Sequence, residues 1–133
     1  MKLFIGLYCS FIIGLALYLR QDSALAQSME RGKEVYADFC ITCHMAEGEG
    51  VAYTFPPLAA SDFVNNKRTE SLHAIKFGLQ GEITVNGETY NGNMAPMGLE
   101  DEEIADVMNY IGHSWGNALE KMVTPEEVAT LKK

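Results

Sequence analysis

The stretch Cys40-Ile41-Thr42-Cys43-His44 decides the fold expected for this sequence. Two cysteines separated by two residues, with a histidine directly after the second, are the pattern of covalent haem attachment. The spacing follows from the chemistry, because two thiols three positions apart can add to the two vinyl groups on one edge of a porphyrin. The adjacent imidazole then lies under the ring. We therefore predict one covalently bound haem c, attached to Cys40 and Cys43, with His44 as an iron ligand.

Two other interpretations of this motif fit the surrounding sequence less well. A redox C-x-x-C motif normally lies near a βαβ pattern, whereas here a helical pattern precedes Cys40 and a glycine- and proline-rich stretch follows His44. A structural zinc site needs four ligands, and only His73 and His113 remain as nitrogen donors. Haem attachment also supplies a large apolar filling for a core that would otherwise be small.

A mostly helical domain is predicted around the motif. Apolar residues recur at helical spacing in four segments whose ends carry residues typical of helix termini. These segments are residues 28–39, 69–79, 99–115 and 124–131. Ser28 is the expected N-cap of the first. Thr124 begins a capping box with Pro125 at the first helical position of the last.

The segment between the first two helices predicts a long ordered loop. Residues 45–62 contain Gly48, Gly50, Pro56 and Pro57, which together exclude a regular helix or strand. Loops of this length in compact domains usually carry function. We therefore expect this loop to carry part of the functional site.

A β-hairpin is predicted just before two methionines. Asn86-Gly87 lies between alternating residues, which is the strongest short-range hairpin signal. The loop that follows contains Met94 and Met97, and Pro96 keeps it out of helix. A thioether from this loop can therefore reach across to the iron as its sixth ligand.

Met94 is the predicted sixth ligand, and the sequence leaves alternatives open. Met97 lies in the same loop and is the second candidate. Met108 falls on the apolar face of a helix, where core packing is the usual role of methionine. His73 or His113 as a second imidazole, or an open coordination position, complete the possibilities.

Residues 1–26 are interpreted as a cleaved secretory signal. A basic start is followed by an apolar run over residues 3–19 and by Ala24-Leu25-Ala26, a small-x-small cleavage pattern. The mature chain, residues 27–133, would then be a single domain in the periplasm or another extracytoplasmic space. Cys9 would be removed with the signal.

An uncleaved membrane anchor is the alternative for this segment. A helix of 17 residues at about 1.5 Å per residue is roughly 26 Å long, close to a hydrocarbon core of about 30 Å. Either interpretation places the domain outside the cytoplasm. A membrane contact is expected only if the segment stays uncleaved.

Acidic residues dominate the expected mature domain. Residues 27–133 keep 8 of the 10 Lys and Arg residues and 17 of the 18 Asp and Glu residues, a formal charge of −9. This excess argues against nucleic acid or an anionic membrane surface as partner and favours docking on a basic protein. Lys67, Arg68 and Lys76 are the residues that could instead give the haem edge a local positive charge.

The order of these features resembles the class I c-type cytochromes. The resemblance is closest to small bacterial monohaem domains that also occur as subunits of quinoprotein dehydrogenases or fused to copper nitrite reductases. It rests on stretches distributed over residues 32–117, and they are G-K-E-V-Y, F-P-P-L-A-A-S-D, G-L-Q-G-E-I-T-V-N-G-E-T-Y-N-G, D-E-E-I-A and S-W-G-N.

The resemblance implies a mostly α class I fold, in which crossing N- and C-terminal helices, long haem-wrapping loops and a small β-hairpin enclose the haem. It places Gly32 and Tyr36 of the first helix against the last long helix near Val107, Tyr110 and Ile111.

The resemblance also assigns parts of the site. Pro56 matches the proline whose carbonyl accepts the proton of the distal ring nitrogen of His44, and Met94 matches the axial methionine. The family usually has proline directly after that methionine, whereas here Ala95 intervenes. Glu100 replaces a common Ser or Thr cap, with an expected cost on the order of 1 kcal/mol.

The expected function is electron transfer by an iron that cycles between Fe(II) and Fe(III). Redox partners such as a dehydrogenase, a nitrite reductase or a terminal oxidase are implied. With His44 and Met94 bound, no coordination position is left for a substrate. The enzyme alternative is a peroxidase-like or sensor protein with a labile sixth ligand, and a further alternative is a dedicated subunit of one enzyme complex.

Overall fold

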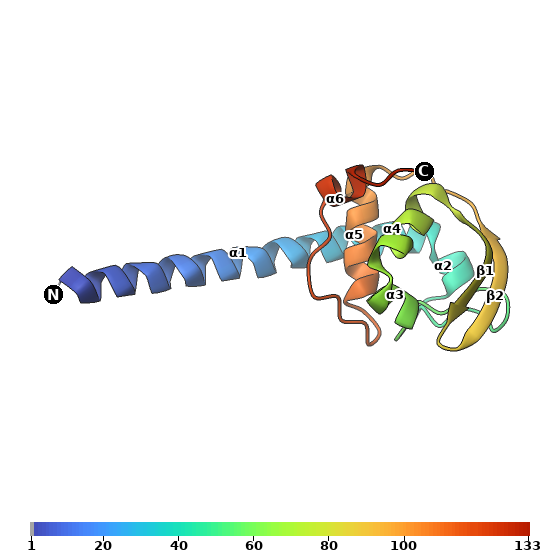
Figure 1. The fold of residues 1–133 in the computed structure, drawn as a ribbon, viewed down its shortest axis with the longest axis horizontal. Coiled ribbons are helices and arrows are strands. Elements are labelled where there is room, and N and C mark those ends of the chain that lie inside the picture. Colours follow the sequence, from blue (N-terminus) through green and yellow to red (C-terminus); the bar gives the residue numbers. More distant parts are fainter. Residues whose placement is uncertain (1) are drawn as a thin grey trace.

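The computed structural model describes residues 2–133 and shows a helical domain with a single two-stranded sheet in that range (Figure 1). The elements in chain order are α1 (Lys2–Phe39), α2 (Ile41–His44), α3 (Asp62–Asn66), α4 (Arg68–Phe77), β1 (Leu79–Val85), β2 (Glu88–Met94), α5 (Asp101–Gly112) and α6 (Pro125–Ala129). The predicted mostly helical fold with a small hairpin is confirmed.

Helix α1 is continuous, and its first half extends away from the rest of the domain (Figure 1). The prediction that Ser28 caps this helix is wrong, because Ser28 lies inside α1. No proline or glycine interrupts residues 15–31, so the helical backbone continues through them. The Ser28 hydroxyl instead donates a hydrogen bond of 2.6 Å to Oδ1 of Asp106 in α5.

Helices α1 and α5 cross at close range, as predicted. Gly32 is buried, and a Cβ atom there would overlap the main-chain carbonyl of Asp106 and lie 2.9 Å from the amide nitrogen of Val107. One turn later, Tyr36 is 2% exposed and its ring lies 5.6 Å from that of Tyr110. The absence of a side chain at Gly32 is what allows the two backbones to meet.

A buried polar cluster lies beside this crossing. Asp106 accepts hydrogen bonds from Arg31 Nε at 2.6 Å and Nη2 at 2.8 Å, in addition to that from Ser28. Asn109 donates to the Ser28 hydroxyl at 2.8 Å and exchanges two hydrogen bonds with the main chain of Val123. These bonds satisfy the buried groups and fasten the segment before α6 to both helices.

The helix predicted over residues 69–79 is present as α4, and a further short helix, α3, precedes it. Ser61 caps α3 by accepting a hydrogen bond from the Val64 amide, and this short helix was not predicted. Helix α4 ends at Phe77, because Gly78 adopts φ +81° and ψ 172°, a conformation restricted to glycine. Leu79 therefore begins a strand and does not end a helix.

The predicted hairpin is confirmed. Asn86 and Gly87 form its turn with positive φ angles, and the antiparallel register pairs Ile83 with Tyr90 and Leu79 with Met94. Met94 is therefore the last residue of β2, at the open end of the hairpin.

The N-terminus of α5 corrects a second expectation. Glu100 does not weaken the helix, because it takes part in a full capping box. Its carboxylate accepts the main-chain amide of Glu103, and Oε2 of Glu103 accepts the Glu100 amide at 2.8 Å. A carboxylate accepts these hydrogen bonds as a hydroxyl does, and its negative charge suits the positive end of the helix.

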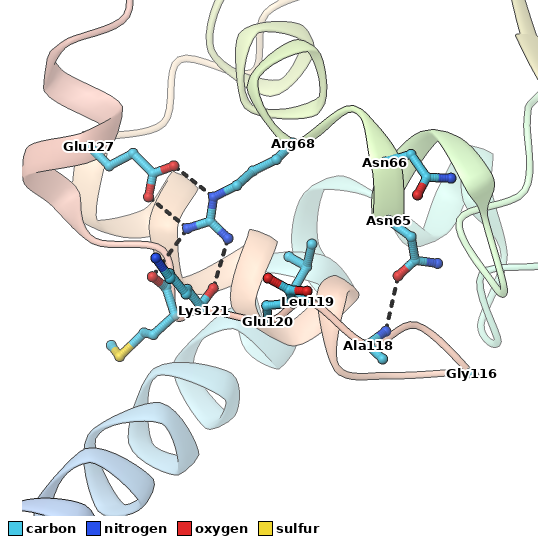
Figure 2. Close-up of a pocket in the computed structure, with 10 residues that line it drawn as sticks. Asn65, Asn66, Arg68, Gly116, Ala118, Leu119, Glu120, Lys121 and Glu127 are labelled. Carbon is cyan, nitrogen blue, oxygen red and sulfur yellow. Dashed lines mark hydrogen bonds and ion pairs between the residues drawn. The ribbon is translucent and has the colours of Figure 1, made fainter.

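Arg68 joins the start of α4 to the C-terminal region (Figure 2). Thr124 caps α6 as predicted, because its hydroxyl accepts a hydrogen bond from the Glu127 amide. The carboxylate of Glu127 binds Arg68 through two contacts of 2.7 Å, which lower the pKa of Glu127. Arg68 also donates to the carbonyls of Lys121 and Met122. Helix α6 ends at Ala129, two residues before the predicted end.

The hydropathy of α1 and the other helices bears on membrane insertion. Across residues 2–133, no helix combines the length and the hydropathy needed to cross a bilayer.

Substitution of Gly32 tests the helix crossing. Glycine to alanine inside a helix normally stabilises by about 0.5–1 kcal/mol. Here Gly32→Ala should destabilise, and Gly32→Val should cost about 1–3 kcal/mol, because the added atoms overlap the α5 main chain. Thermal unfolding measures this effect. Lys33→Ala, an exposed neighbour, should change stability by less than about 0.5 kcal/mol, and an unchanged midpoint in Gly32→Val would contradict the crossing.

Candidate functional site

A large apolar cavity lies between the helices and the hairpin. Its volume is about 570 Å³, within the usual range of roughly 300–1,000 Å³ for ligand sites. The walls come from the segment around α2, the loop before α3, helix α4, both strands, the loop after β2 and helix α5. All five predicted site residues line it, together with Met97; the five are Cys40, Cys43, His44, Pro56 and Met94.

The short helix α2 places the motif on one wall of the cavity. The amides of Cys43 and His44 both donate to the Cys40 carbonyl, at 3.1 and 2.9 Å, so the chain makes a single turn there. Cys40 and Cys43 are free thiols and are partly buried. Burial and the neighbouring Cys43 raise the pKa of Cys40 to about 11. The two cysteine side chains line the same apolar space from this one turn.

His44 is held by a main-chain acceptor. Its Nδ1 lies 2.9 Å from the carbonyl oxygen of Pro56. Burial lowers the pKa of His44, and the hydrogen bond to Pro56 opposes that shift. A neutral imidazole that donates from Nδ1 keeps the lone pair of Nε2 free, which is the state in which histidine binds a metal.

Glycine at position 50 lets the Pro56 carbonyl reach the imidazole. The Gly50 amide donates to the His44 carbonyl at 3.0 Å, and Gly50 has φ +65°. A Cβ atom there would overlap the Phe55 carbonyl and lie 2.8 Å from the carbonyl oxygen of Pro56. The loop therefore folds back tightly on the motif.

Three aromatic rings support the back of this wall. Tyr36 packs against Tyr110 and Trp115, with centroid distances of 5.6 and 5.0 Å. The Tyr36 hydroxyl donates to the carbonyl of Met45 at 2.7 Å, directly after His44. Burial raises the pKa of Tyr36, so the hydroxyl stays a proton donor. The cluster ties the α1–α5 crossing to the residue that follows the motif.

Strand alternation brings Met94 to the cavity. Successive residues of a strand face opposite sides, so Tyr90 and Met94 share a face of β2. Tyr90 is 6% exposed and lines the cavity, as does Met94. Met97 lies three residues beyond the strand and also lines the cavity. The structure thus brings both methionines into the same space as His44, and only Met94 is fixed by the register of the hairpin.

The other sequence candidates lie elsewhere. His73 stacks on Phe77 with ring centroids 4.8 Å apart, and Nδ1 of His113 lies 2.9 Å from the Asn109 carbonyl. Neither histidine lines the cavity. Met108 is fully buried in the core, as expected, and closes one side of the cavity.

Several apolar lining residues were not identified from the sequence. They come from α3, α4 and the hairpin, and they are Phe63, Val64, Ala74, Ile83 and Val85. The alternation of apolar residues in β1 could have indicated two of them, because Ile83 and Val85 share one strand face.

A second hollow, of about 630 Å³, contains none of the site residues (Figure 2). It lies beside Asn65, Arg68 and the segment after α5. Its polar groups bind one another: Oδ1 of Asn65 accepts the Ala118 amide at 3.0 Å, and Arg68 binds Glu127. We assign it no ligand.

The cavity fits a covalently bound haem better than a metal ion. Two thiols three positions apart face an apolar space with a neutral imidazole beside them and thioethers among its walls. Among residues 2–133, no group of three or more His, Cys, Asp or Glu side chains could hold an ion on its own. The donor set therefore suits a flat apolar macrocycle that brings its own nitrogen ligands.

The known proteins that this chain resembles are c-type cytochromes or cytochrome c subunits of enzymes. The cytochrome c family model matches residues 29–115. Cytochrome c-552 of Thermus thermophilus is 39% identical over 127 residues, which covers 89% of this chain and 84% of that protein. The cytochrome c subunit of the quinone alcohol dehydrogenase of Gluconacetobacter polyoxogenes is 34% identical over 110 residues, and the match covers 76% of this chain and 22% of the subunit.

A third relative is the gluconate 2-dehydrogenase cytochrome c subunit of Pantoea cypripedii. It is 31% identical over 125 residues, which covers 85% of this chain and 28% of that subunit. This chain therefore matches most of a small single protein and about a quarter of the larger dehydrogenase subunits.

Proposed function

Because the chain belongs to the cytochrome c family and is an electron-transfer cytochrome with covalently bound haem c, we propose that His44 and Met94 are the axial ligands of its iron. Family membership confirms the predicted fold, cofactor and electron-carrier function. The observation that carries the ligand assignment is that Cys40, Cys43, His44 and Met94 line one apolar cavity.

The protein contributes position and environment. When bound, the haem supplies a one-electron couple between Fe(III) and Fe(II). Pro56 orients His44 and raises the basicity of its imidazole through the hydrogen bond of 2.9 Å. Met94 ligation raises the reduction potential compared with a second histidine. The apolar walls exclude water and disfavour the extra charge of the oxidised state.

Ligation by both His44 and Met94 limits the chemistry to outer-sphere electron transfer. No coordination position then remains for peroxide, oxygen or another substrate. The enzyme alternative needs a labile sixth ligand, and it would show itself as a five-coordinate or high-spin spectrum in the resting protein.

We also propose that residues 1–26 are a signal that is removed on export to the periplasm. Burial in the domain begins at Ser28, just beyond the expected cleavage point. Upstream, large apolar side chains such as Phe11, Ile13 and Tyr18 are 60–67% exposed along α1. Removal of this segment would leave the contacts of Ser28 and Arg31 with Asp106 in place.

A basic redox partner is proposed from the charge of the mature domain. Two of the three residues that could reverse the local sign are already engaged. Arg68 binds Glu127 at 2.7 Å, and Lys76 binds Asp101 at 2.7 Å. The third residue, Lys67, takes part in neither ion pair, and its Nζ lies over the ring of Phe63. The net charge of −9 is therefore expected to govern docking. A dehydrogenase, a nitrite reductase or a terminal oxidase fits this role.

Intact mass of the exported protein under denaturing conditions tests attachment and processing together. The expected mass is that of residues 27–133 plus one haem. The double substitution Cys40→Ser, Cys43→Ser should lose the haem, because no thioether then holds it. Haem retained by the double variant would contradict the attachment, and a mass that includes residues 1–26 would contradict cleavage.

Optical spectra of the oxidised protein test the sixth ligand. The weak far-red band that reports sulfur-to-iron ligation should be present, and Met94→Ala should remove it and lower the reduction potential. Met97→Ala is the control and should keep the band. The reverse pattern would assign the ligand to Met97.

Electron-transfer rates against ionic strength test the docking charge. The rate to a basic partner should fall as salt rises, since the Debye length shrinks from about 30 Å at 0.01 M to about 8 Å at 0.15 M. An acidic partner of similar potential should show the opposite slope. A flat or rising rate with the basic partner would indicate a basic or apolar docking face instead.

A further inference from the structure

Gly78 lies where helix α4 passes into the strand that pairs with Met94. Its amide donates to the Ala74 carbonyl at 2.9 Å and ends the helix. Leu79, the next residue, pairs with Met94 in the hairpin register. The backbone of Gly78 is therefore the point at which α4 meets the segment of the proposed ligand.

The Met94 main chain lies directly against Gly78. A Cβ atom at position 78 would lie 2.6 Å from the carbonyl oxygen of Met94, 3.0 Å from Cδ of Pro96 and 3.1 Å from the Pro96 nitrogen. Real Cβ atoms do not approach a carbonyl oxygen that closely. Any side chain at this position would push the Met94–Pro96 segment outward, away from α4.

The end of α4 is itself braced against two other helices. Nζ of Lys76 lies 2.7 Å from Oδ1 of Asp101 at the start of α5 and donates to the Val128 carbonyl of α6 at 2.8 Å. The Lys76 side chain is only 19% exposed. Gly78 therefore offers the ligand segment a surface whose position is fixed relative to the core.

We propose that Gly78 is a positioning residue for the sixth ligand: the bare Cα at the braced end of α4 lets the Met94 backbone lie close enough to hold its thioether in the cavity. The inference rests on the proposed ligation by Met94. It adds a requirement beyond the Cys40–His44 motif. Gly78, sixteen positions before Met94 in the chain, would set the strength of the sulfur-to-iron bond.

The chain offers a matched control at Gly98. Gly98 also has a positive φ, +73°, and follows the same methionine loop, but a Cβ atom there would meet no heavy atom within 4 Å. Alanine at either position must adopt a positive φ angle, which is unfavourable for a residue with a side chain. Only alanine at position 78 also displaces Met94.

The experiment compares oxidised Gly78→Ala, Gly98→Ala and Met94→Ala holoproteins with the wild type. The readouts are the far-red band per haem and the dissociation constant for added imidazole, which competes with the thioether for the iron. Gly78→Ala should lose most of the band and bind imidazole at least about ten-fold more tightly. Gly98→Ala should keep the band and stay within about two-fold of the wild-type dissociation constant.

Each outcome bears on one claim. A full band and wild-type imidazole binding in Gly78→Ala would overturn the positioning role while the Met94 assignment stands. A band that persists in Met94→Ala would overturn the ligand assignment, and the inference with it. Loss in Gly78→Ala together with retention in Gly98→Ala supports the proposal.

A second pair of variants applies if Gly78→Ala does not fold. Lys76→Met keeps the apolar stem but removes the brace beside Gly78, and it should tighten imidazole binding by about three-fold or more. Arg68→Met removes an ion pair at the opposite end of α4 and should leave imidazole binding unchanged even though it lowers the unfolding midpoint. Equal imidazole affinities in the two variants would overturn the positioning role of this end of α4.

Discussion

The contact between Gly32 and the main chain of α5 is the constraint on which the rest of the structure depends. Helix α1 ends at Phe39, immediately before the haem-attachment motif, and α5 begins shortly after the methionine loop. The crossing therefore fixes both halves of the site at once. A shift of one helix along the other would move the thiols and His44 relative to Met94, although none of these residues lies at the crossing.

Polar groups make this crossing specific. Apolar helix faces alone tolerate sliding, whereas Asp106, which is 4% exposed, needs the hydrogen bonds of Ser28 and Arg31 in one register. Leaving such a buried carboxylate without partners costs several kcal/mol. Asn109 extends the same register to Val123 and so to the C-terminal segment.

The sequence predicted what depends on local chemistry and missed what depends on distant partners. Spacing and periodicity were enough to predict the motif at residues 40–44, the Asn86-Gly87 turn and the burial of Met108. Ser28 was misjudged because its partner, Asp106, lies 78 residues away in the chain. Glu100 is a different case, because its partner Glu103 is local and a glutamate was not considered as a capping residue. The five-residue helix α3 was also missed. Its cap, Ser61, directly follows a loop rich in glycine and proline, and the sequence there was interpreted as irregular.

The middle of the chain is arranged around the apolar cavity. Its loop, hairpin and short helices face a space of about 570 Å³, which is within the usual range of ligand sites. The α1–α5 crossing is made by residues that do not line the cavity, such as Gly32 and Asp106, whereas the hairpin places Tyr90 and Met94 on its walls. Different contacts therefore hold the two walls of the cavity: the crossing of α1 and α5 holds the wall that carries Cys40, Cys43 and His44, and the register of the hairpin holds the wall that carries Met94.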